Sequence, residues 1–87
     1  MRGSSLYDFS AHAGTVMDER GILPQWVDRV LRNPEKTEVD KANPELQHAL
    51  GRIVERGNRV LRVVYHAKST PWRIVTVYFD RGQRGKI

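Results

Sequence analysis

The chain contains no cysteine, which excludes a disulfide framework, a thiolate metal site and a cysteine nucleophile. No apolar run approaches the ~18 residues of a membrane span, and no signal-peptide pattern opens the sequence. Glycine-rich phosphate loops, a serine in a nucleophile elbow and metal-ligand spacing of histidines are missing as well. These absences argue against covalent or metal-dependent hydrolysis. They favour a cytoplasmic protein with no resident cofactor and no membrane partner.

The 87 residues are enough for one domain with a thin core. Residues 1–5 resemble an expression-vector leader or a disordered segment, residues 6–81 are expected to form the domain, and residues 82–87 a basic tail. The net charge of +5, from 15 basic and 10 acidic side chains, favours an anionic partner, either a nucleic acid or an acidic protein. A solvated basic surface with no partner would have the same composition.

Two amphipathic helices are predicted in the first half of the chain. Ser10 is a suitable N-cap for a helix over residues 11–20, and Gly21 supplies the left-handed residue that commonly ends a helix. Pro24 suits the first turn of a second helix, which is expected to end at Asn33. The short turn between the helices also suggests a helix-turn-helix, but the second helix carries few side chains that read bases, so DNA readout is not favoured.

The second half of the chain is rich in β-branched and aromatic residues and favours strands. The predicted strands are residues 36–39 (a short edge strand), 48–55, 59–66 and 72–79. Gly57-Asn58 is expected to form a two-residue hairpin turn. The expected fold is therefore α+β, with two N-terminal helices packed on one face of a three- or four-stranded antiparallel sheet.

The alternation of side chains along the last two predicted strands assigns each residue to one face of the sheet. Pairing these strands through residues 67–71 sets Val64 opposite Ile74. The more apolar face, expected beneath the helices, then holds Leu61, Val63, Tyr65, Val75, Val77 and Phe79. The open face holds Val60, Arg62, Val64, His66, Trp72, Ile74, Thr76 and Tyr78. The hairpin turn places Leu50 and Val54 on the helix side.

Without a metal or a cofactor, the polar residues of the chain could still act on RNA. The 2′-hydroxyl of RNA cleaves the neighbouring phosphodiester bond when an acid, a base and cations are supplied. The candidate catalytic residues are His12, Arg62, Thr76 and Tyr78. His12 would exchange a proton and Arg62 would bind the phosphate. Thr76 and Tyr78 would orient the phosphate or stack on a base. Further residues expected to bind RNA or a partner are Arg59, His66, Trp72, Arg73, Arg81 and Arg84.

The strongest candidates also have structural interpretations. His12 could be a helix residue that bonds to a strand or loop. Arg62 could pair with Glu19 or Glu55, which would make it part of the fold and not of a binding site. Tyr78 is as well suited to packing as to binding.

Two groups of residues carry a resemblance to a known family. They are the run His12-Ala13, Met17 and Glu19-Arg20-Gly21-Ile22, and the closing segments 59–65 and 74–78. They resemble a bacterial family of small domains of unknown function that is related to the RelE/ParE-like toxin superfamily. The resemblance covers about residues 9–81 and implies two N-terminal helices on a curved antiparallel sheet. The family typically has a histidine on its first helix, which His12 matches, but Val16 replaces the basic residue that commonly precedes the helix methionine.

The resemblance implies a toxin-like, metal-independent endoribonuclease or RNA-binding protein of a toxin–antitoxin type. Its partners would be RNA or the ribosome and an antitoxin-like or other acidic protein. The superfamily also contains gyrase inhibitors and members without known activity, so the fold alone does not decide the function. The alternative is a non-catalytic interaction module whose basic sheet face binds an acidic partner segment.

Overall fold

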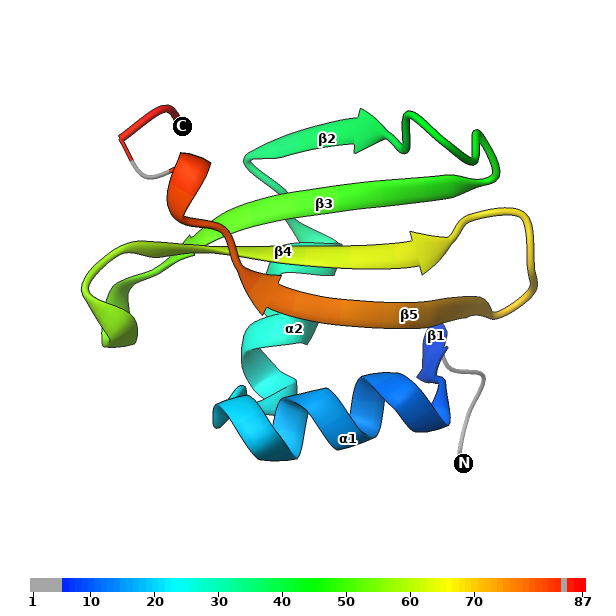
Figure 1. Ribbon diagram of the computed structural model, residues 1–87, viewed down its shortest axis with the longest axis horizontal. Helices are drawn as coiled ribbons and strands as arrows, with labels where there is room; N and C mark the ends of the chain where they lie inside the picture. The colour runs from blue at the N-terminus through cyan, green and yellow to red at the C-terminus, as the bar shows by residue number, and fades with distance from the viewer. Residues whose placement is uncertain (1–5, 84) are drawn as a thin grey trace.

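The computed structural model describes residues 6–83 and 85–87. The expected leader, residues 1–5, and the candidate Arg84 lie outside the described residues. Two helices pack on one face of a five-stranded mixed sheet (Figure 1). The elements follow in the order β1 (Tyr7–Phe9), α1 (Ala11–Arg20), α2 (Pro24–Arg32), β2 (Lys36–Val39), β3 (Leu46–Ile53), the short 3₁₀ helix η1 (Val54–Arg56), β4 (Arg59–His66), β5 (Trp72–Phe79) and the 3₁₀ helix η2 (Arg81–Gln83).

The sheet has the strand order β1-β5-β4-β3-β2. Strands β2 to β5 form an antiparallel meander, and β1 pairs with β5 in parallel. The α+β class with two helices is confirmed. The expected three or four antiparallel strands are corrected to five strands with one parallel pair. A strand of three residues, as β1 is, shows too little alternation to be predicted from sequence.

Helix α1 begins and ends as its sequence indicates. The Ser10 hydroxyl accepts a hydrogen bond from the Ala13 N–H at 3.1 Å, which satisfies one free donor of the first turn. Gly21 has a φ of 65° and its N–H donates to the Met17 carbonyl, so it ends the helix in the left-handed conformation. Ala13 and Met17 are buried toward the sheet.

The helix also covers the part of β5 that β1 leaves unpaired. Strand β1 pairs only with residues 72–74. Beyond them, the Ser10 hydroxyl donates to the Val75 carbonyl at 3.2 Å, and Arg20 Nη1 donates to the Val77 carbonyl at 2.8 Å. Side chains from both ends of α1 therefore satisfy this edge, and the second of them fixes an arginine beside the end of β5.

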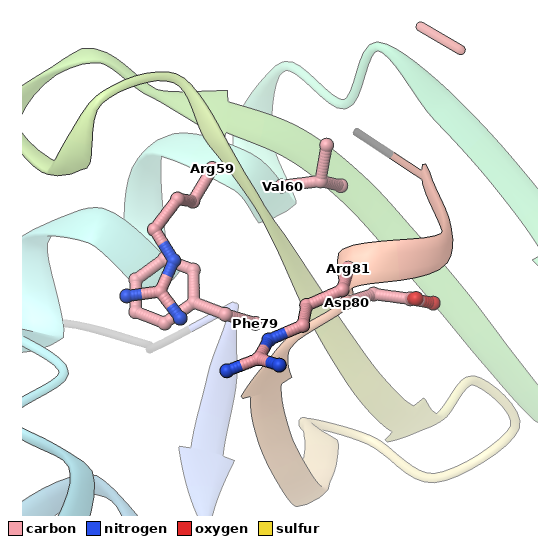
Figure 2. Close-up of a pocket in the computed structure, with 5 residues that line it drawn as sticks. All are labelled: Arg59, Val60, Phe79, Asp80 and Arg81. Carbon is pink, nitrogen blue, oxygen red and sulfur yellow. The ribbon is translucent and has the colours of Figure 1, made fainter. Parts of the chain in front are cut away.

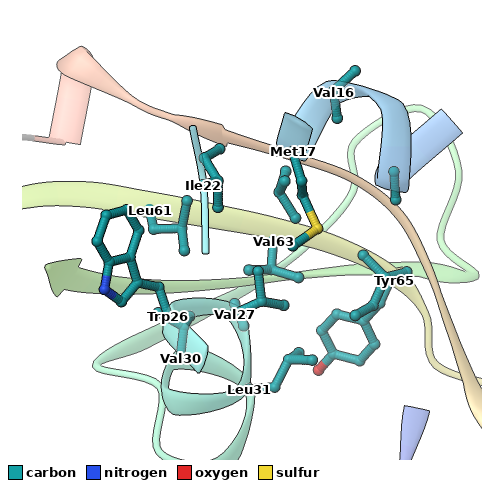
Figure 3. Packing of buried hydrophobic residues seen from close by; sticks show 14 of the residues in the cluster. Val16, Met17, Ile22, Trp26, Val27, Val30, Leu31, Leu61, Val63 and Tyr65 are labelled. Carbon is teal, nitrogen blue, oxygen red and sulfur yellow. The ribbon is translucent and has the colours of Figure 1, made fainter. Parts of the chain in front are cut away.

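The hydrophobic core lies between the two helices and the central strands (Figure 3). Helix α2 contributes Trp26, Val27, Val30 and Leu31. Gly51 of β3 allows the helix to approach, because a Cβ at this position would lie 3.2 Å from Cγ2 of Val30. The side chains of the sheet that complete the core are Ala49, Ile53, Leu61, Val63, Tyr65, Ile74 and Val77.

A bulge in β5 changes the expected register. Val64 pairs with Thr76 and Tyr65 with Ile74, so Val75 has no partner across the ladder. The helix-side assignment is confirmed for Leu61, Val63, Tyr65, Val77 and Phe79. It is wrong for Val75, which is only partly buried and lies outside the core.

The bulge also moves two residues from the expected open face to the helix side. Ile74 is fully buried at 0% exposure within the core. Trp72 packs against the core, and its ring lies 4.9 Å from that of Tyr65. The expectation that Ile74 and Trp72 face outward is therefore wrong, since the extra residue in the strand reverses the side on which they project.

The connection between β3 and β4 is longer than expected. Strand β3 ends at Ile53, which pairs with Arg59, and five residues separate the two strands. Three of the five form η1, so the expected two-residue turn is wrong. Leu50 therefore pairs with Arg62 on the face opposite the helices, and Val54 is 73% exposed. The longer loop reverses the predicted faces of β3 because side chains alternate along a strand.

The segment after β5 covers part of the face opposite the helices (Figure 1). The Asp80 N–H donates to the Val60 carbonyl at 2.8 Å, and Gln83 of η2 accepts a hydrogen bond from Lys36 Nζ at 3.3 Å. Beneath this segment Leu50 and Val60 are fully buried although they lie outside the helix-side core. The face of the sheet opposite the helices is therefore partly covered by the protein itself.

Candidate anion-binding site

Arg62, which is only 7% exposed, lies at the centre of a partly buried ion-pair network on the face opposite the helices. Its Nε and Nη2 lie 2.8 Å and 2.7 Å from Asp80 Oδ2. Its Nη1 donates to Glu38 Oε1 at 3.0 Å and to His48 Nδ1 at 2.7 Å. Burial opposes the charge of Arg62, but the hydrogen bonds with Glu38 and Asp80 outweigh it, so the pKa of Arg62 lies above its ordinary value.

The bond with Arg62 determines the tautomer of His48. A guanidinium only donates, so Nδ1 accepts, and Nε2 carries the proton that it donates to Asp40 Oδ1 at 2.8 Å. The hydrogen bond from His48 lowers the pKa of Asp40, and the hydrogen bond from Arg62 lowers the pKa of Glu38. Both ring nitrogens of His48 are occupied, which leaves neither of them for proton exchange with a ligand.

The structure does not bring the four candidate catalytic residues together. Tyr78 lies opposite Arg62, and Thr76 lies opposite Val64 on the same face. His12 lies exposed on α1, which packs on the other face of the sheet. The structural alternative for Arg62, an ion pair within the fold, is confirmed, but its carboxylate partners are Glu38 and Asp80 and not Glu19 or Glu55.

We expect Arg62→Lys to lower the free energy of unfolding by about 1–2 kcal/mol. Lysine keeps the charge but cannot donate to Asp80, Glu38 and His48 at once. Urea unfolding of both proteins measures the loss. Arg52→Lys is the matched control, because the Arg52–Glu35 pair is exposed and should change stability by no more than about 0.5 kcal/mol. An equal effect of the two replacements would mean that the Arg62 network contributes no more than a surface ion pair.

Three of the residues predicted to bind RNA or a partner lie where β4 ends and β5 begins, and each contacts another part of the protein. Arg73 Nε lies 2.9 Å from Asp8 Oδ1, and His66 Nε2 lies 3.1 Å from Glu45 Oε1. Trp72 packs against the core. This end of the sheet therefore presents few charges that lack an internal partner.

Arginines in the described part of the chain fall into two groups. Five are paired with carboxylates, namely Arg29, Arg32, Arg52, Arg62 and Arg73. Four others, within the same described residues, have no carboxylate at ion-pair distance and line a single pocket of about 480 Å³ with Tyr78 and Phe79. These four, Arg20, Arg56, Arg59 and Arg81, are called the arginine cluster below.

Contacts with β5 hold three arginines of the cluster in place. The hydrogen bond to the Val77 carbonyl holds Arg20. The guanidinium of Arg56 lies 5.7 Å from the Trp26 ring centre and 5.3 Å from that of Phe79. The Arg59 guanidinium lies over the Phe79 ring in Figure 2, with its carbon 4.7 Å from the ring centre. Both distances to Phe79 are within the range of cation–π attraction.

Arg81 completes the cluster at the end of β5. It lines a pocket of about 410 Å³ with Arg59, Val60, Phe79 and Asp80, and in Figure 2 its side chain extends toward the Arg59 guanidinium. The Asp80 carboxylate points away from the Arg59 and Arg81 guanidinium groups in Figure 2, and its Oδ2 binds Arg62 while Oδ1 accepts the Gly82 N–H at 2.9 Å. The arrangement therefore suits a ligand with several negative charges.

Arg59 and Arg81 belong to the residues predicted to bind, and the structure brings them together. Arg20 and Arg56 were missed as binding residues. They lie far from Arg81 in the chain, and only the length of the β3–β4 loop places Arg56 beside Phe79. No local sequence signal marks that arrangement.

Two further features of the described residues bear on the site. No group of three or more histidine and carboxylate side chains in residues 6–83 and 85–87 could hold a metal ion. None of the helices in these same ranges has the length and apolar character needed to cross a membrane.

The chain was also compared with known proteins. A sequence profile for the family described as "Domain of unknown function (DUF4258)" matches residues 9–79. No curated protein and no solved structure matches the chain. The matched region extends from the end of β1 to the end of β5 and includes every member of the arginine cluster except Arg81. The chain therefore belongs to the DUF4258 family.

Proposed function

We propose that this protein is a cytoplasmic RNA-binding protein and that the arginine cluster is its RNA-binding surface. The proposal rests on the difference between arginines that are paired with carboxylates and arginines that are not. Five are neutralised within the fold, while the four of the cluster meet around Tyr78 and Phe79. Four neighbouring cations without carboxylates repel one another, and an anionic ligand would relieve that repulsion.

RNA fits the site better than a single small anion does. The cluster draws its arginines from α1, η1, β4 and η2, so its charges are spread over the end of the sheet. Aromatic rings stand among these charges, and RNA-binding surfaces combine cations for the backbone with flat groups for the bases. The sequence resembles a bacterial family of small domains that is related to the RelE/ParE-like toxin superfamily, which includes ribonucleases. This resemblance supports RNA as the ligand, and we propose a RelE-like relationship for the fold.

Cleavage of RNA is not part of the proposal. His12 projects from α1, on the other side of the sheet from Arg62. Arg62 is bound to two carboxylates, so its charge is largely neutralised. The mechanism that the sequence suggested would need both groups at one phosphate.

The test is the salt dependence of binding to a labelled single-stranded RNA, measured by fluorescence anisotropy. Four phosphate contacts predict a slope of about −3 for log K against log salt concentration, at about −0.7 for each contact on a single strand. An acidic peptide serves as competitor. Absence of RNA binding at low salt would overturn the proposal. Stronger binding of the acidic peptide than of RNA would also overturn it, in favour of a protein partner.

A further inference from the structure

Phe79 provides a rigid support for the Arg59 side chain. Its ring packs edge-on against Trp26, with centroids 6.4 Å apart and an interplanar angle of 61°. Trp26 belongs to the core, and the Phe79 backbone pairs with Leu61 across the sheet. Phe79 is thus fixed from two directions, and the Arg59 guanidinium that lies 4.7 Å from its centre is positioned with it.

A guanidinium placed over a ring has a second face that the ring does not cover. Arg59 lines both pockets of the arginine cluster and is only partly buried (Figure 2). The face of the guanidinium turned away from Phe79 is flat and positively charged. Unpaired nucleic-acid bases stack on such guanidinium planes as they do on aromatic rings.

We propose that the arginine cluster holds an unpaired RNA base against the Arg59 guanidinium, in a stack of Phe79, Arg59 and base. Arg81 and Arg20, which line the same pocket as Phe79, bind the neighbouring phosphates. This inference rests on the proposed function and extends it, because it makes single-stranded RNA the ligand. In a duplex the bases are already paired and stacked, so they cannot enter the pocket of about 410 Å³ beside Arg59 without first being unpaired.

The experiment combines a change in the protein with a change in the RNA. The probes are a labelled single-stranded RNA, a backbone oligomer of the same length without bases, and a duplex. Arg59→Lys keeps the charge and loses the plane, and Arg81→Lys is the matched control at a phosphate contact. We expect the parent to bind the single strand at least about tenfold more tightly than either the base-free oligomer or the duplex. Arg59→Lys should abolish that preference, because its binding of the single strand should fall to the level of the base-free oligomer. Arg81→Lys should preserve the preference.

A second variant removes the support and leaves every charge in place. Phe79→Leu should also abolish the preference for the single strand, and thermal unfolding of each variant verifies that it is folded. Equal preferences in the parent and Arg59→Lys would overturn base stacking while leaving RNA binding intact. A parent that prefers duplex RNA would do the same. A parent that binds none of the three probes would overturn the proposed function itself.

Discussion

Replacing Ile74 by alanine should lower the free energy of unfolding by about 2–5 kcal/mol, the usual cost of truncating a buried isoleucine. Ile74 has 0% exposure and lies among core residues, so the missing atoms would leave a cavity. Val75→Ala, one residue later, should cost no more than about 1 kcal/mol, because Val75 stands in the bulge and outside the core. Urea unfolding of the two variants measures the difference.

The comparison is sharp because the two possible registers predict opposite results. In an unbroken ladder Val75 would lie under the helices with Val77, and Ile74 would face outward. A larger loss for Val75→Ala than for Ile74→Ala would therefore support the unbroken register. The slope of the unfolding free energy against urea concentration should be the same in both variants as in the parent. An unchanged slope means that unfolding exposes the same amount of surface.

The bulge could not be predicted from the sequence, although the strand was. Ile74 and Val75 are adjacent, apolar and β-branched, so either fits a core position. The choice depends on whether one residue is left out of the ladder, and no special residue type marks that event here. The strand after the bulge keeps its expected faces, which is why Val77 and Tyr78 were assigned correctly.

The β3–β4 connection shows a second limit of sequence reasoning. Gly57 and Asn58 adopt left-handed conformations, with φ of 67° and 63°, as a two-residue hairpin turn would require. The turn signal was thus correct for the two residues but gave the wrong length for the loop. Val54 favours a strand, so the expected strand extended to residue 55, but residues 54–56 fold into a 3₁₀ helix. This reverses the face on which Leu50 lies.

The candidate site could be predicted only in part from the sequence, because a residue's type gives its charge but not the group with which it pairs in the fold. Arg62 and Arg59 lie three residues apart and look equivalent in the chain. The strand pairing brings Glu38 and Asp80 to Arg62, while Arg59 receives an aromatic ring. Which arginine remains available to a ligand is therefore decided by tertiary contacts. We therefore propose the arginine cluster, and not the neutralised Arg62, as the phosphate contact.

Reversing two charges of the cluster tests that conclusion directly. Arg59→Glu combined with Arg81→Glu should weaken binding of single-stranded RNA about 100-fold at moderate salt, since the lost base stack at Arg59 and the lost phosphate contact at Arg81 each cost about 1–3 kcal/mol. The salt dependence should become shallower, because fewer counterions are released from the RNA. Fluorescence anisotropy over a range of salt concentrations measures both quantities.

The matched control tests whether RNA binding depends on the position of the lost charges or only on their number. Lys41→Glu combined with Lys68→Glu lowers the net charge of +5 by the same four units, and both lysines are exposed and lie outside the arginine cluster. This variant should lose much less affinity than the cluster variant, because a distant exposed charge is screened by salt beyond roughly 10 Å. Thermal unfolding verifies that both double variants are folded. Equal losses of affinity would show that RNA responds only to the overall charge of the protein, and the arginine cluster would then have no special part in binding.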